Sequence, residues 1–116
     1  MASSSIYTTT PGLSAYMASK AGVLGLTSGL ANDLGQFGIT VNAVSPGLTR
    51  TPAVEEDVAA GRLSEAALEA MIDQRAIRRA GTPQDLVGTV AFLVSDDAAF
   101  MTGQFLVADG GHVRPW

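Results

Sequence analysis

The sequence alternates helical segments with short apolar runs, and this alternation limits the possible fold more than any other feature. Residues 39–44 and 104–108 are the two short runs, and they lead into Ser-Pro-Gly and Asp-Gly-Gly turns. Parallel strands need crossover connections, usually helices, which then cover both faces of the sheet. The pattern therefore predicts an α/β fold with two strands, or three if residues 1–3 end another strand.

Three segments have the periodicity of helices. No proline interrupts residues 14–37, residues 64–77 begin at a serine cap, and residues 83–95 follow Thr82, a predicted cap before a proline. The positions expected to be buried are Val23, Leu26, Leu30 and Leu34 in the first helix, Ala67, Leu68, Met71 and Ile72 in the second, and Leu86, Val87, Val90, Ala91 and Val94 in the third. The second helix lies in a polar segment, residues 51–79, which we expect to cover a site.

Composition excludes several classes of function. The net charge is −4, with seven lysines and arginines in no basic run, which argues against a nucleic-acid partner. Polar residues and glycines interrupt every apolar stretch before the roughly 20 residues that a bilayer span requires. The chain has no cysteine and a single histidine, His112, so we expect neither a disulfide framework nor a metal site. These features predict a cytoplasmic protein without a membrane segment.

One pair of residues suggests acid–base chemistry. Tyr16 and Lys20 stand four positions apart in a predicted helix, so their side chains share one face. A free tyrosine has a pKa of about 10, and an ammonium group nearby stabilises the phenolate. Such a pair can move a proton to or from a carbonyl oxygen closer to neutral pH. The spacing alone is common among helices, so its context decides whether the pair is functional.

The context resembles the short-chain dehydrogenase/reductase family. The segment PGLSAYMASKAGVLGLTSGLANDLGQFGITVNAVSPGLTRTP combines a Tyr-x-x-x-Lys helix with a strand that ends in Asn-x-x-x-Pro-Gly-x-x-x-Thr. A third block, GTPQDLVGTVAFLVSDDAAFMTGQFLVADGG, is similar to the last helix and last strand of the family. The resemblance covers nearly the whole chain. It implies the C-terminal half of a Rossmann-like, doubly wound parallel sheet, with two or three strands and flanking helices.

The resemblance also implies a catalytic set. Tyr16 corresponds to the general acid/base, and Lys20 would favour its ionised form and bind the nicotinamide ribose. The catalytic serine of the family precedes the tyrosine by thirteen residues, which gives Ser3. Its hydroxyl would donate a hydrogen bond to the substrate oxygen. Because Ser4 and Ser5 are adjacent, a small gap would move this assignment to one of them.

Cofactor contacts follow from the same resemblance. In the family, the backbone after the Pro-Gly pair and the threonine that follows contact the nicotinamide carboxamide, which maps onto Pro46, Gly47, Thr49 and Thr51. The implied cofactor is NAD or NADP, and the implied substrate is a ketone or a secondary alcohol. Residues that choose between the two cofactors precede the matching segment, so the choice stays open. The family's variable substrate lid corresponds to about residues 51–80.

The chain departs from the family in one respect. A full-length member has a Gly-x-x-x-Gly-x-Gly loop whose backbone N–H groups bind the pyrophosphate, and residues 1–116 contain none. We therefore expect a partial domain, the distal half of a longer parent. Two hypotheses follow: an oxidoreductase, or a truncated, noncatalytic fragment that acts as a self-associating module. An open sheet edge and uncovered helices predict a homo-oligomer in either case.

Overall fold

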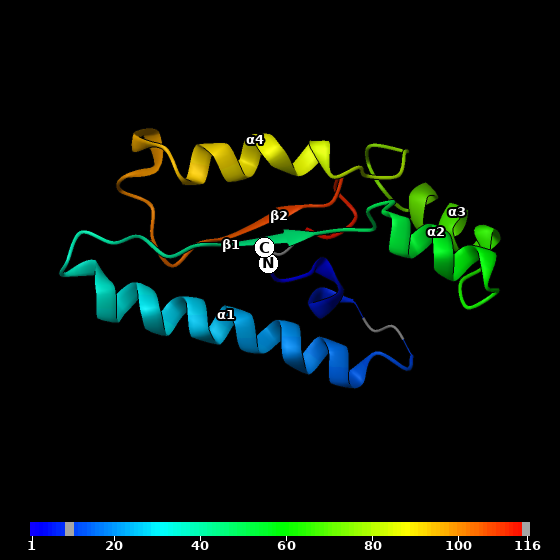
Figure 1. The fold of residues 1–116 in the computed structure, drawn as a ribbon, viewed down its shortest axis with the longest axis horizontal. Coiled ribbons are helices and arrows are strands. Elements are labelled where there is room, and N and C mark those ends of the chain that lie inside the picture. Colours follow the sequence, from blue (N-terminus) through cyan, green and yellow to red (C-terminus); the bar gives the residue numbers. More distant parts are fainter. Residues whose placement is uncertain (9–10, 115–116) are drawn as a thin grey trace.

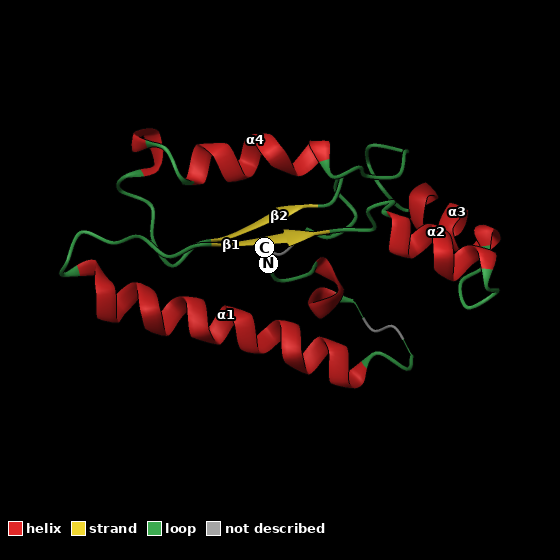
Figure 2. Ribbon diagram, in the orientation of Figure 1, coloured by secondary structure: helices red, strands yellow, loops and turns green. Residues whose placement is uncertain are grey.

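The computed structural model describes residues 1–8 and 11–114 and has three layers. A parallel sheet of β1 (Ala43–Pro46) and β2 (Phe105–Ala108) lies between helix α1 (Ser14–Gly35) and helix α4 (Gln84–Leu93), as Figures 1 and 2 show. Both strands run toward the end of the molecule where residues 47–82 are found. The predicted α/β fold is confirmed, with two strands within the described residues.

The paired strands are short, and side chains contribute to the contacts that precede them. Strands β1 and β2 pair in parallel from Ala43 with Phe105 to Pro46 with Ala108. Before them, the Val41 N–H donates to Thr102 Oγ1 (3.0 Å), and the Asn42 amide bonds the backbone of residues 101 and 104. The prediction of a strand from residue 39 was wrong by four residues, because the regular ladder starts at Ala43. Before it, a backbone bond from the Gly103 N–H to the Val41 carbonyl oxygen (2.7 Å) accompanies the side-chain bonds.

The opening residues lie along the other side of β1. The Ala2 N–H donates to the Val44 carbonyl oxygen at 2.8 Å, which is a single strand-like bond. The chain then turns into a short 3-10 helix, η1 (Ser4–Tyr7), instead of extending further. Residues 1–3 thus occupy the place of a third strand without forming one.

Two short helices project beyond the carboxyl ends of the strands. Helix α2 (Pro52–Ala59) was missed from the sequence, although Thr51 caps it by accepting from the Val54 N–H at 3.4 Å. Helix α3 (Glu65–Asp73) has the predicted serine cap, with Ser64 Oγ accepting from the Ala67 N–H at 3.1 Å. It ends four residues earlier than expected. Only Leu68 of its predicted stripe is buried.

Helix α4 begins in a different way from the prediction. The Thr82 hydroxyl does not accept a backbone N–H of the helix; instead the N–H and the hydroxyl of Thr82 both donate to the Asp85 carboxylate, at 2.7 and 2.9 Å. The Asp85 carboxylate, in the first turn of the helix, thus accepts hydrogen bonds from both donors of the residue that precedes Pro83. No helix among the described residues is both long and apolar enough to cross a bilayer.

The apolar stripes predicted for α1 and α4 are largely exposed. Leu26 is 62% exposed, Val87 61% and Val94 80%, whereas Thr27 and Ala31 are the buried positions of α1. The reason is geometric: two strands lie about 4.8 Å apart, while a helix with its side chains is about 10 Å across. The sheet therefore covers only a narrow strip of each helix, and the predicted burial was wrong at these positions.

The chain exposes more surface than a compact monomer of its size. Its accessible surface is 7273 Å², whereas a compact monomer of this mass exposes about 5,900 Å². The excess, about 1,300 Å², is larger than the ~800 Å² that each partner buries in a standard interface. A shallow apolar hollow of about 340 Å³, lined by Val44, Val90 and Val94 among others, lies between α4 and β1.

We therefore expect the chain to self-associate at micromolar concentration, because association removes exposed apolar surface from water. Sedimentation velocity should show a dimer or larger species. Leu26→Asp on α1 and Val94→Asp at the C-cap of α4 should show which helix face forms the interface, since only the variant within the interface will restore the monomer. A well-folded 11.9 kDa species for the unchanged chain would contradict this prediction.

Candidate active site

Helix α1 brings Tyr16 and Lys20 together near its N-terminal end. The Lys20 ammonium lies 5.5 Å from the centroid of the Tyr16 ring, and it donates to the Met1 carbonyl oxygen at 3.5 Å. Tyr16 is 44% exposed, so its phenol is open to a ligand from solvent. The sequence spacing correctly predicted that these two side chains meet. The contact with Met1 ties the pair to the opening segment.

The serine cluster is arranged around the start of η1. Ser3 Oγ caps η1 and accepts from both the N–H and the hydroxyl of Ser5, at 3.3 and 2.9 Å. Because a hydroxyl also carries one hydrogen, the Ser3 hydrogen is left to donate. Ser4 is buried, whereas Ser3 and Ser5 are half-buried. This geometry favours Ser3 over Ser4 as a residue that reaches a ligand.

The loop after β1 contains the predicted cofactor residues and packs tightly. Pro46 is the last residue of β1, and the Gly47 N–H donates to the Ala108 carbonyl oxygen at 3.3 Å. A Cβ on Gly47 would lie 2.5 Å from the Asp109 Cβ, so only glycine fits between the two strand ends. The loop after β1 is therefore fixed against the loop after β2.

Two threonines follow in this loop. Thr49 Oγ1 donates to the Gly47 carbonyl oxygen at 3.0 Å. Thr49 also forms a parallel bridge with Gly81. In this bridge the Gly81 N–H donates to the Leu48 carbonyl oxygen, and the Gly81 carbonyl oxygen accepts from the Arg50 N–H. Thr51 caps α2 through its hydroxyl oxygen. Within residues 1–8 and 11–114, the N–H groups of Leu48 and Thr49 donate to no protein acceptor.

A buried arginine, which sequence reasoning missed, lies under this loop. Arg75 is only 5% exposed, and its guanidinium donates to the carbonyl oxygens of Leu48 (2.8 Å) and Arg79 (3.1 Å). Burial lowers the pKa of Arg75, and the Asp109 carboxylate opposes that shift. In the sequence Arg75 stands close to Arg78 and Arg79, where it resembles an ordinary solvated charge.

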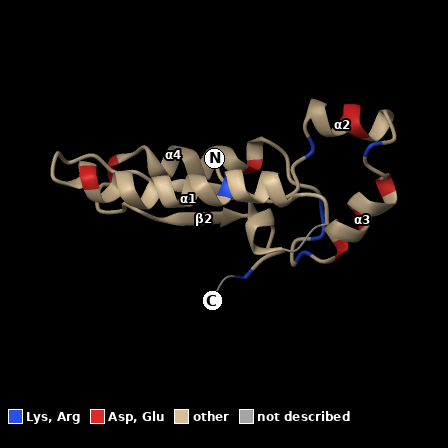
Figure 3. Ribbon diagram, turned by 90° about the horizontal axis from the view of Figure 1, so that it is seen from below, with Lys and Arg blue, Asp and Glu red and all other residues tan. Residues whose placement is uncertain are grey.

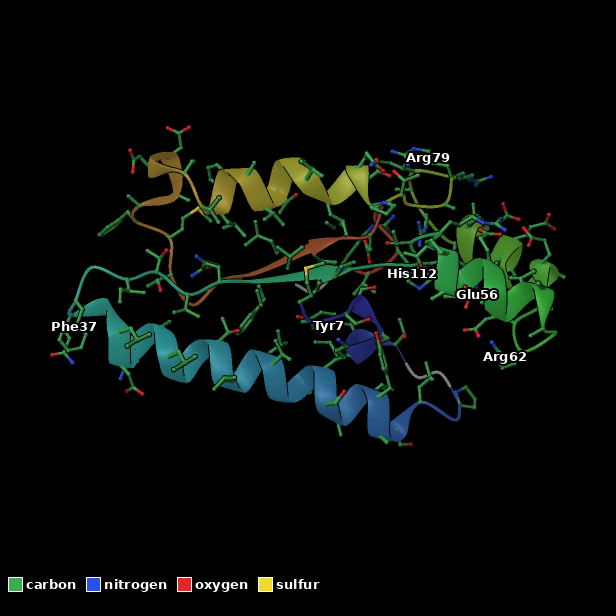
Figure 4. All side chains as sticks on the ribbon, in the orientation of Figure 1. Tyr7, Phe37, Glu56, Arg62, Arg79 and His112 are labelled. Carbon is green, nitrogen blue, oxygen red and sulfur yellow. The ribbon has the colours of Figure 1, made fainter. Side chains whose placement is uncertain are left out.

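Asp109 is the second buried charge that the sequence did not reveal. Its carboxylate accepts the N–H groups of Gly111, His112 and Val113, at 2.9 to 3.1 Å. These bonds close the turn after β2, which includes His112, labelled in Figure 4. Arg75 and Asp109 both line an open hollow of about 570 Å³ at the carboxyl ends of the strands.

Charged pairs hold the projecting helices. Arg50 bridges Glu55 of α2 and Glu65 of α3, with both shortest distances 2.6 Å. The Arg50 guanidinium lowers the pKa of Glu55, and the Arg79 guanidinium lowers that of Asp85. Figure 3 shows that charged residues concentrate on α2, α3 and their loops, whereas α1 and α4 carry few.

The predicted site residues form two groups. Ser3, Tyr16 and Lys20 lie where η1 contacts α1, on one face of the sheet. Pro46, Gly47, Thr49 and Thr51 extend from the carboxyl end of β1, toward which the N-terminal end of α1 also points in Figure 1. No hydrogen bond joins the two groups in the part of the chain that the structure describes. Ligands of open α/β sheets bind at the carboxyl ends of the strands.

The fold belongs to the doubly wound α/β class, and comparisons with known proteins agree. The sequence model of a family described as enoyl-(acyl carrier protein) reductase matches residues 1–112. This chain belongs to the short-chain dehydrogenase/reductase family. A solved structure of 4-hydroxyisoleucine dehydrogenase complexed with NADH superposes with a TM-score of 0.86 at 36% identity, over 99% of this chain and 46% of that one.

Curated relatives match over a similar range. The 7alpha-hydroxysteroid dehydrogenase of Bacteroides fragilis is 46% identical over 96 residues, which is 83% of this chain and 35% of the relative. A 3-oxoacyl-(acyl-carrier-protein) reductase of Staphylococcus epidermidis is 43% identical over 101 residues, 87% of this chain and 39% of the relative. The chain thus spans between a third and two fifths of the length of these relatives.

Proposed function

We propose that this chain provides the catalytic residues of an NAD(P)-dependent oxidoreductase that interconverts a ketone and a secondary alcohol. The observation that carries the proposal is the pair of Tyr16 and Lys20, an exposed phenol with an ammonium group over its ring. Membership in the short-chain dehydrogenase/reductase family gives this pair its chemical meaning. The relatives above are dehydrogenases and reductases, which agrees with this reaction class.

The donors around the site suit the nicotinamide end of a dinucleotide. The Lys20 ammonium is a donor for ribose hydroxyls. The Thr49 N–H, which has no protein acceptor among residues 1–8 and 11–114, is a donor for the carboxamide oxygen. The Thr51 hydroxyl already accepts from Val54, so its hydrogen is left to donate. The residues present therefore fit the cofactor. When bound, the nicotinamide would supply or accept the hydride.

The chain's own residues would handle the proton. During reduction, Tyr16 Oη gives its proton to the substrate oxygen as the carbonyl carbon gains the hydride, and the reverse occurs in oxidation. Ser3 would donate a hydrogen bond to the same oxygen and stabilise its developing negative charge. Lys20 would stabilise the phenolate that Tyr16 becomes after losing its proton.

A second candidate rests on the excess exposed surface. A chain that exposes about 1,300 Å² more than a compact monomer could act as a self-associating, noncatalytic module. Binding of cofactor distinguishes the two candidates. A ligand that binds only the native state must stabilise it, so NAD(H) or NADP(H) will raise the melting temperature only if the site is competent.

The test uses parts of the cofactor. Reduced nicotinamide mononucleotide, at ten times its dissociation constant, should raise the melting temperature of the chain by roughly 5 °C. AMP should have a much smaller effect, because it lacks the carboxamide that the Thr49 N–H and the Thr51 hydroxyl would bind. The Lys20→Ala variant serves as the control and should lose most of the shift. Absence of any shift with nicotinamide nucleotides would favour the noncatalytic candidate.

A further inference from the structure

Arg75 joins three segments that are far apart in the sequence. It follows α3, and its side chain lies among the loop after β1, the turn after β2 and the end of the projecting segment. Its Nη2 donates to the Leu48 carbonyl oxygen at 2.8 Å, and its Nη1 donates to the Arg79 carbonyl oxygen at 3.1 Å. A Cβ added to Gly47 would lie 3.2 Å from Nη2, and one added to Gly110 would lie 3.5 Å from Cδ.

The bond to Leu48 has a consequence for the next residue. The carbonyl oxygen of Leu48 and the N–H of Thr49 belong to one planar trans peptide, in which the two groups point in opposite directions. That oxygen accepts from both Arg75 (2.8 Å) and the Gly81 N–H (3.2 Å). The Thr49 N–H is therefore directed away from both donors, and it is left without a protein acceptor among the described residues.

We propose that Arg75 is a positioning residue for the nicotinamide-binding loop. By donating a hydrogen bond to the Leu48 carbonyl oxygen, it orients the Thr49 N–H toward the carboxamide. This inference rests on the proposed function, because it assigns Thr49 to the nicotinamide. It adds a residue outside the serine, tyrosine and lysine set, and the effect assigned to it is exerted through the Leu48–Thr49 peptide.

The chemistry of the side chain explains why arginine stands there. A guanidinium presents several N–H donors in a rigid plane, so one group can bind two carbonyl oxygens. Lysine, with a single ammonium on a flexible stem, has a weaker hold on two separate acceptors. Asp109, in the adjacent turn, supplies the negative charge that favours a buried cation. Removing the guanidinium would leave the Arg79 carbonyl without this bond and the Leu48 carbonyl with Gly81 alone.

The test compares Arg75→Met, Arg75→Lys and the matched control Arg78→Met. Arg78 is exposed and carries the same charge three residues along the chain. The affinity for reduced nicotinamide mononucleotide is measured by its fluorescence, well below the melting temperature of each variant. We expect the dissociation constant to rise about tenfold in Arg75→Met, to recover in part in Arg75→Lys and to stay unchanged in Arg78→Met.

A second measurement needs no ligand. The amides of Arg50 and Gly81 bond across this loop, and their hydrogen exchange should become about tenfold faster in Arg75→Met than in Arg78→Met. Amides within α1 should not change. If Arg75→Met does not fold, Arg75→Lys replaces it in both measurements, with smaller changes in the same direction.

The outcomes separate the two proposals. If exchange becomes faster in Arg75→Met but the dissociation constant is unchanged, Arg75 has only a structural role and the positioning role is overturned. Unchanged exchange in Arg75→Met would also overturn the positioning role. If the unmodified chain binds no nicotinamide nucleotide, the proposed function fails. The exchange rates then decide alone whether Arg75 fixes the loop.

Discussion

Replacing Tyr16 with phenylalanine should lower turnover by a factor of roughly 10² to 10⁴, the usual contribution of a general acid or base. The substitution removes the transferable proton and keeps the ring over which Lys20 lies. The phenol is 44% exposed and makes no side-chain hydrogen bond to the described residues, so its loss should not destabilise the fold. Affinity for the nicotinamide nucleotide should therefore change by no more than about threefold.

Turnover is measured in a chimera, in which this chain replaces the matching segment of the Bacteroides fragilis 7alpha-hydroxysteroid dehydrogenase. Tyr7 is the other tyrosine of the chain and is also exposed, so Tyr7→Phe is the matched control. It should retain most of the activity. Equal turnover in the Tyr16→Phe and unmodified chimeras would show that Tyr16 is not the general acid or base of the reaction.

Replacing Lys20 with alanine should impair both cofactor binding and turnover, because one ammonium group serves the ribose and the Tyr16 phenolate. Hydrogen bonds to charged groups contribute about 1.5–3 kcal/mol, which corresponds to a loss of affinity of roughly tenfold to a hundredfold. The additional loss in turnover should appear as a lower kcat. The cofactor titration and the chimera assay measure the two effects separately.

The Lys20→Arg variant tests geometry apart from charge. It keeps a cation near Tyr16, but its planar group is larger than an ammonium. We expect it to restore part of the cofactor affinity and little of the turnover. If Lys20→Ala lowers only the melting temperature and leaves affinity and kcat unchanged, the pair is structural.

Local signals in the sequence predicted much of the fold. The serine cap of α3 and the unbroken stretch of α1 placed these helices, because caps and periodicity depend on neighbouring residues alone. Helix α2 shows the limit of this reasoning. Its threonine cap and first-turn proline are present in the sequence, but the composition of residues 51–79 predicts only a polar segment with a helix further along.

Burial was harder to predict than secondary structure. Leu26 and Val94 have the spacing of core residues and are nevertheless exposed, since the two strands are too narrow to cover either helix. The boundary of β1 depends in the same way on a distant segment. The Val41 N–H donates to Thr102 Oγ1 and the Asn42 amide donates to the Met101 carbonyl oxygen, across 61 and 59 positions of sequence, and no local pattern indicates such contacts.

The sequence by itself determined the α/β class, the meeting of Tyr16 with Lys20 and the family to which the chain belongs. Each depends on short spacings, and one turn of a helix is enough to bring residues four apart together. Only the tertiary structure decided that Arg75, among several exposed arginines, is buried beneath the Leu48 carbonyl. That position depends on three segments converging at the ends of two parallel strands. A guanidinium is buried there only because carbonyl oxygens replace the water molecules that would otherwise accept its hydrogen bonds.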